Sequence, residues 1–187
     1  MVDQAIATAR RHVARGARDD ARRALASASG FTAGEPSVLL KIGGAALELR
    51  DYAFAEQCYR AIVERDPSVV PGWCGLALAL TLQRRDQEAF ACAQRARELA
   101  PRSIAVARVY ASTAVQAGDS LAAIAACRDA LTRLPNDVGL SCQLADALRA
   151  TGAGDEARMI LQPIAGTLRA TPELHAILGG LLLDSGD

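Results

Sequence analysis

The 34-residue stretch PSVLLKIGGAALELRDYAFAEQCYRAIVERDPSV, residues 36–69, contains two apolar stripes separated by a polar break. Leu39, Ile42 and Ala46 recur at spacings of three and four, which is the pattern of one face of an α-helix. A second stripe begins at Ala55 and ends before Pro67, a residue that cannot continue a helix. The stretch therefore predicts two helices joined by a tight turn, an αα-hairpin.

The same pattern returns along the chain with a period of 34 residues. Alanine fills one column of this period without interruption: Ala21, Ala55, Ala89, Ala123 and Ala157. A second column holds glycine at most of its places and arginine at two of them: Gly16, Arg50, Arg84, Gly118, Gly152 and Gly186. Proline forms a third column: Pro67, Pro101 and Pro135. A fixed period of this length indicates stacked helical repeats.

We therefore expect an all-α fold, a right-handed solenoid of stacked antiparallel helix hairpins that forms a single domain over 1–187. Its units are expected at about 2–35, 36–69, 70–103, 104–137 and 138–171, with one extra C-terminal helix at 172–184. The helices are expected at 2–15, 18–29, 36–49, 52–65, 70–83, 86–99, 104–117, 120–133, 138–151, 154–167 and 172–184.

Three kinds of residue should mark the helix ends. The glycine column should supply left-handed caps between paired helices. Asp51 and Asp119 should cap the N-termini of the helices that follow them. Pro163 lies inside the helix expected at 154–167 and predicts a kink or an early end there.

These columns resemble the tetratricopeptide repeat family. In the unit at 70–103 the residues that follow the order of the family's signature are Trp73, Leu76, Leu80, Ala89, Ala96 and Pro101. The first unit is the most degenerate, because His12 replaces a core residue and no proline closes the unit. The resemblance covers essentially the whole chain and implies a scaffold that binds protein partners.

The composition narrows the function classes. Lysine and arginine together number 21, as do aspartate and glutamate, so no overall field attracts nucleic acid or an acidic membrane. Five cysteines without CxxC spacing and only two histidines argue against a zinc site. We expect reduced, structural thiols and a cytoplasmic location. Lys41 is the only lysine, an arginine bias typical of a GC-rich bacterial genome.

No catalytic motif is present in the sequence: GxSxG, HExxH, GxxxxGK[ST] and GxGxxG are all missing. We expect no enzymatic activity and no cofactor. The first unit is rich in arginine, but Phe31 is its only aromatic residue for stacking on bases. A solvated terminal cap is therefore preferred there over a nucleic-acid site.

Stacked hairpins curve and place their first helices on the concave side. The faces of the first helices opposite their core stripes should line a groove for a partner segment, and the predicted contact residues are Arg10, Leu40, Lys41, Leu78, Arg108, Ser112, Gln116, Gln143 and Asp146. Gly44, Gly75 and Cys142 share these faces, and the two glycines should leave room. Family members that bind a peptide's terminal carboxylate use a Lys/Asn/Arg cluster on these helices, which this chain lacks. The alternative interpretation is that these are merely solvated helix faces, since single exposed apolar residues are common.

The C-terminal helix leaves two further hypotheses open. It is apolar on several sides, and the sequence stops where a second helix should begin. This favours a fragment of a longer protein, such as the N-terminal substrate-docking region of a bacterial glycosyltransferase, sulfotransferase or methyltransferase. Homodimerisation through this helix is the other hypothesis.

Overall fold

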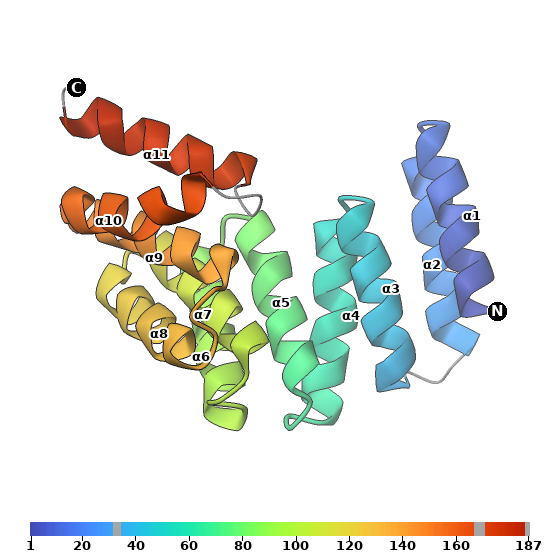
Figure 1. The fold of residues 1–187 in the computed structure, drawn as a ribbon. Coiled ribbons are helices and arrows are strands. Elements are labelled where there is room, and N and C mark those ends of the chain that lie inside the picture. Colours follow the sequence, from blue (N-terminus) through green and yellow to red (C-terminus); the bar gives the residue numbers. More distant parts are fainter. Residues whose placement is uncertain (32–34, 167–170, 186–187) are drawn as a thin grey trace. The chain divides into compact units, whose positions relative to one another are not determined.

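The computed structural model describes residues 1–31, 35–166 and 171–185, and all regular secondary structure in these ranges is α-helical (Figure 1). The helices are α1 (Val2–Ala14), α2 (Arg18–Phe31), α3 (Pro36–Glu48), α4 (Tyr52–Arg65), α5 (Val70–Leu82), α6 (Asp86–Leu99), α7 (Ile104–Gln116), α8 (Ser120–Arg133), α9 (Val138–Ala150), α10 (Gly154–Ala165) and α11 (Pro172–Ser185). Each begins at the residue predicted from the sequence, which confirms the all-α arrangement of successive hairpins.

The chain divides into two compact units. The first unit, Met1–Leu99, contains the hairpins α1–α2, α3–α4 and α5–α6. The second unit, Ala100–Asp187, contains α7–α8 and α9–α10, and its last helix is α11. Within each unit the second helix of a hairpin packs against the first helix of its own hairpin and of the next one.

The turn inside each hairpin has the same backbone geometry. The residue in the glycine column is left-handed at every described place, with φ of 77° at Gly16, 87° at Gly118 and 81° at Gly152. Arg50 and Arg84 adopt the same conformation, with φ of 60° and 63°. The next residue's amide donates back across the turn in each hairpin: Ala17 N to His12 O, Asp51 N to Ala46 O, Arg85 N to Leu80 O, Asp119 N to Ala114 O and Ala153 N to Leu148 O.

This geometry confirms the predicted left-handed cap and extends it to the two arginines. The sixth member of the column, Gly186, lies outside the described residues. The first helices of the five hairpins end one residue earlier than predicted, because the residue before the left-handed position is already part of the cap.

Side-chain caps and proline act as predicted at the other helix ends. Asp51 accepts a hydrogen bond from Phe54 N at 3.2 Å, and Asp119 accepts one from Ala122 N at 3.0 Å. The proline inside α10, Pro163, lies two residues before the last helical residue, Ala165. The helix continues through Pro163 and ends two residues before the predicted residue 167.

The alanine column lies in the core, with every member buried. Alanine at this position lets paired helices approach closely, and larger residues fill the space between neighbouring hairpins. In the first unit these include Leu25, Ile42, Ile62 and Leu80, each with 1% or less of its surface exposed.

The first helices of each unit also contact one another directly. In the first unit α3 contacts both α1 and α5, and in the second unit α9 contacts both α7 and α11. No comparable contact joins α2 to α4, α4 to α6 or α8 to α10 among the described residues. Helices that touch lie on the inner side of a curved stack, so each unit has an inner face formed by its odd-numbered helices.

Candidate partner-binding face

The nine predicted contact residues all lie on odd-numbered helices and all reach solvent. Arg10, Lys41, Leu78, Arg108 and Gln116 are exposed. Leu40, Ser112, Gln143 and Asp146 are half-buried. Four of the nine belong to the inner face of the first unit, on α1, α3 and α5, and five belong to that of the second unit, on α7 and α9.

Ion pairs join neighbouring helices on the inner face of the first unit. Arg10 on α1 pairs with Glu48 on α3, with 2.6 Å between Nη2 and Oε2. Lys41 on α3 lies 3.9 Å from a carboxylate oxygen of Asp3 on α1, and the Lys41 side chain is 62% exposed. Lys41 is thus held only loosely and can pair with an acidic group from outside, whereas Arg10 already has a close partner.

A tyrosine from the second helix of a hairpin reaches this inner face. Tyr59 belongs to α4, and its ring lies between α3 and α5 against the backbone of two glycines, Gly43 and Gly75. A Cβ atom added at Gly43 would lie 2.8 Å from Tyr59 Cζ, and one added at Gly75 would overlap the ring. A Cβ atom added at Gly44, on the solvent side of Gly43, would lie 3.9 Å from the hydroxyl oxygen and would touch no other part of the ring.

The Tyr59 hydroxyl has no hydrogen-bond partner among the described residues, although only 5% of the whole residue is exposed. The hydroxyl oxygen itself remains accessible to solvent. Burial, with a smaller effect of Cys58, raises the pKa of Tyr59 to about 12, so the group is a neutral donor at physiological pH. The hydroxyl emerges beside Gly44, on the helix face that also carries Leu40 and Lys41.

Two sequence expectations are wrong at this point. Gly75 is buried and leaves no room in the groove, because the Tyr59 ring occupies the space. Cys142 is only 1% exposed and belongs to the core of the second unit.

Sequence reasoning also missed Tyr59, because it considered only first helices. The signal was present in the 34-residue columns. Gly43 and Gly75 stand in columns that mostly hold larger residues, and Tyr59 stands in a column that otherwise holds smaller or aliphatic residues. The columns read Ala9, Gly43, Ala77, Ala111, Ala145 and Gly179; then Ala7, Lys41, Gly75, Val109, Gln143 and Ile177; then Leu25, Tyr59, Ala93, Cys127 and Leu161.

On the inner face of the second unit, two predicted residues support the fold. Arg108 on α7 forms an ion pair with Asp137, whose side chain is only 7% exposed and also caps α9 through Leu140 N at 2.9 Å. Gln143 on α9 donates from Nε2 to the carbonyl oxygen of Arg108 at 3.2 Å. These contacts tie α7 to α9, so substitution of Arg108 will also lower stability.

The remaining second-unit residues lie at the more open end of the same face. Asp146 lines a recess of about 420 Å³ together with Val115, Arg149 and Ala150. Ser112 and Gln116 lie four residues apart on α7, on one side of that helix. This part of the face therefore carries polar groups beside a recess.

The cysteines behave as core residues. Cys58, Cys127 and Cys142 are buried, and Cys74 and Cys92 are half-buried, all as free thiols. Burial raises the pKa of Cys58 to about 11 and that of Cys127 to about 12, so both remain protonated and unreactive. Among the described residues no group of three or more His, Cys, Asp or Glu side chains could hold a metal ion.

Stacked αα-hairpins of constant length define a class, the helical repeat proteins. Residues 114–181 match the tetratricopeptide repeat model. Solved structures with the same fold include the tetratricopeptide repeat protein TTC0263 of Thermus thermophilus, with a TM-score of 0.72, 18% identity and coverage of 98% of this chain and 100% of that one. A tetratricopeptide repeat protein of Parabacteroides merdae gives a TM-score of 0.78 at 14% identity, covering 99% and 72% of the two chains.

A third similar structure is YrrB, described as a tetratricopeptide repeat protein with an unusual peptide-binding site. It has a TM-score of 0.66 and 14% identity, with coverage of 87% of this chain and 84% of that one. No curated protein matches the chain in sequence. Residues 114–181 are thus similar to the tetratricopeptide repeat family, and the chain shares the fold of solved tetratricopeptide repeat proteins.

The described helices differ from membrane-spanning helices. None of them combines the length and the apolar character needed to cross a bilayer.

Proposed function

We propose that this protein is a non-catalytic interaction module that binds a peptide segment of a partner protein on the inner face of its first unit. The fold is that of a protein-interaction scaffold, and YrrB, which shares it, is described as having a peptide-binding site. The observation that carries the proposal is the unpaired Tyr59 hydroxyl between α3 and α5.

The groups around Tyr59 match the chemistry of a peptide. The hydroxyl can donate to a backbone carbonyl, and the small Gly44 beside it lets a main chain approach. Leu78 on α5 is 42% exposed and offers apolar contact. Lys41 can pair with an acidic side chain or a terminal carboxylate. The preferred ligand is therefore an extended segment with an apolar and an acidic residue.

Peptide selection on the full chain tests this function. Linear peptides selected from a random display library are titrated by calorimetry against the wild type, Tyr59→Phe and Lys41→Ala. Loss of one hydrogen bond of about 1 kcal/mol should raise Kd roughly fivefold in Tyr59→Phe. The control is Met159→Gln, since Met159 is 75% exposed on the second helix α10. If the selected peptides bind all four proteins equally, the inner face of the first unit is not the binding site.

A further inference from the structure

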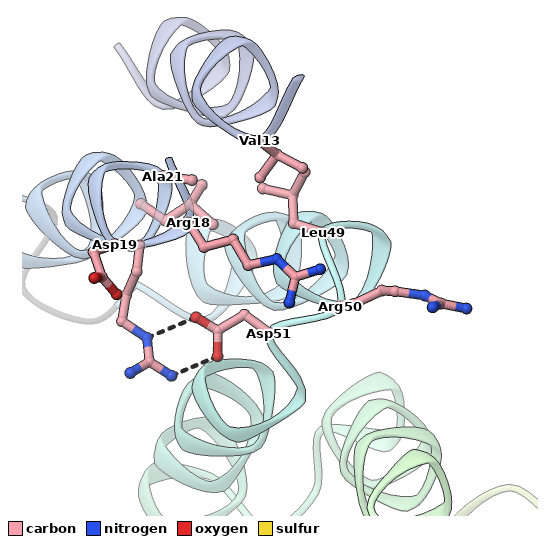
Figure 2. Close-up of a pocket in the computed structure, with 9 residues that line it drawn as sticks. Val13, Arg18, Asp19, Ala21, Leu49, Arg50 and Asp51 are labelled. Atoms are coloured by element: carbon pink, nitrogen blue, oxygen red, sulfur yellow. Dashed lines mark hydrogen bonds and ion pairs between the residues drawn. The ribbon is translucent and has the colours of Figure 1, made fainter. Parts of the chain in front are cut away.

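A pocket of about 240 Å³ lies in the first unit at the turn end of its first two hairpins, and Tyr59 is not among the residues that line it. Its lining comes from the end of α1, the start of α2 and the turn between α3 and α4: Val13, Arg18, Asp19, Ala21, Arg22, Leu25, Leu49, Arg50 and Asp51 (Figure 2). Three arginines and two aspartates thus surround one small space.

One of the three arginines is already neutralised. Arg22 donates from Nε and Nη2 to the two carboxylate oxygens of Asp51, both at 2.6 Å, which are the dashed bonds in Figure 2. Burial alone would raise the pKa of Asp51, but the hydrogen bonds from Arg22 and Phe54 N outweigh it and lower that pKa. The pair therefore stays ionised and forms one wall of the pocket.

The other two guanidinium groups have no partner among the described residues. Neither Arg18 nor Arg50 forms an ion pair or a side-chain hydrogen bond there. Figure 2 shows Arg18 reaching from α2 over Leu49 and Asp51 toward the turn, while Arg50 extends outward from that turn. With Asp51 occupied by Arg22 and only Asp19 left to oppose them, these two groups give the pocket an excess of positive charge.

Both arginines stand where the local backbone disfavours them. Arg18 is the first residue of α2, where the helix dipole repels a cation, and its column in the other units reads Tyr52, Asp86, Ser120 and Gly154. Arg50 is left-handed, at a place where three units have glycine. Arg84 has the same left-handed backbone away from the pocket, so it is the combination with Arg18 that distinguishes this place.

We infer that this pocket binds a small oxyanion of the phosphate type, held by Arg18 in the pocket and by Arg50 at its outer edge, with the Arg22–Asp51 pair as its wall. Guanidinium groups donate in a fork that fits two oxygens of a phosphate. The anion has two sources, a free phosphate compound or a phosphorylated side chain of a partner. The site is independent of the peptide-binding function proposed above.

The test uses inorganic phosphate as the probe on the full chain. Thermal unfolding is followed by circular dichroism at increasing phosphate, with chloride adjusted to constant ionic strength, and the rise in Tm gives Kd. The wild type should show a saturable rise. Arg18→Gln and Arg50→Gly should each raise Kd at least tenfold.

The chain provides a matched control in Arg84→Gly. Arg84 has the same left-handed backbone in the next turn but does not line the pocket. Arg84→Gly should keep the full phosphate response, although it relieves the same backbone strain as Arg50→Gly. Loss of the response in Arg84→Gly, or an equal rise with chloride alone, would overturn the site.

Two peptides then distinguish the sources of the anion. A short phosphoserine peptide and its unphosphorylated form are titrated by calorimetry against the wild type and Arg18→Gln. Tighter binding of the phosphopeptide than of inorganic phosphate assigns the site to a modified partner, and equal affinity assigns it to a free phosphate compound. No binding of either probe to the wild type would remove the proposal.

Discussion

Tyr59 and Gly75 belong to neighbouring hairpins, and the ring of one occupies the space where a side chain of the other would be. The missing Cβ atoms at Gly75 and Gly43 therefore form a slot for the ring between α3 and α5. This slot both closes the core between two hairpins and brings a hydroxyl to the inner face.

The slot predicts opposite effects at two glycines. Gly75→Ala should lower the free energy of unfolding by about 1–3 kcal/mol, because the new methyl group overlaps the Tyr59 ring. Gly44→Ala should raise it by up to about 1 kcal/mol, since the methyl group lies at ordinary contact distance and alanine favours the helix. Urea denaturation measures both variants, and equal effects would contradict the packing described for Tyr59.

The left-handed backbone of Arg84 predicts that a change to glycine at this position stabilises the fold. In Arg84→Gly the free energy of unfolding should rise by up to about 1 kcal/mol, since a left-handed conformation costs a residue with a side chain about that much. The reverse change is Gly118→Ala, where no atom lies within 4 Å of an added Cβ, so only the backbone conformation is penalised. This variant should lose about 1 kcal/mol in the same urea assay. A loss of stability in Arg84→Gly would show that its side chain has a structural role.

The lowered pKa of the Glu56 carboxylate predicts that the stability of the fold depends on pH. Burial alone would raise the pKa of Glu56, but hydrogen bonds from Arg60, Gln83 and Arg85 lower it from 4.5 to about 2. A lowered pKa stabilises the folded state above pH 4.5, and this stabilisation is lost as the pH falls toward 2. The stabilisation that ionised Glu56 contributes is at most about 3 kcal/mol.

The comparison is between the wild type and Glu56→Gln from pH 7 to pH 2.5. The difference in their free energies of unfolding should be largest above pH 5 and should shrink as the pH falls. Glu64→Gln, at an exposed position of the same helix, serves as the control and should follow the wild type throughout. A difference that does not vary with pH would mean that Glu56 acts through packing and not through its charge.

Much of this fold could be predicted from one sequence, because local signals mark its helix ends. Proline at the start of α3 and aspartate before α4 and α8 set helix starts, and the left-handed column sets the turns. The alanine column fixed the register of helix packing. These features depend on residues close together in the chain, and the repeat presents each of them several times.

The candidate sites were harder to predict, since they depend on contacts between hairpins. Whether the Tyr59 ring stays inside its own hairpin or reaches the next one depends on glycines 16 residues away on either side. The positive pocket likewise joins Arg18 to Arg50 from different hairpins. The period gives the position of each residue in its unit but not the direction of a long side chain.

The alanine register itself predicts one further pair of variants. Ala123→Leu should lower the free energy of unfolding by about 1–3 kcal/mol, because Ala123 is fully buried between helices. Ala125→Leu, on the exposed side of the same helix α8, should change it by less than about 0.5 kcal/mol. Equal thermal unfolding of the two variants would contradict the register.

Within each compact unit every helix contacts only helices one or two places away in the chain. Folding therefore requires few long loops to close, and a low mean sequence separation between contacting residues is associated with rapid folding. A single hairpin can act as a nucleus to which its neighbours add in turn, so partial unfolding should begin at the outermost hairpin and proceed inward.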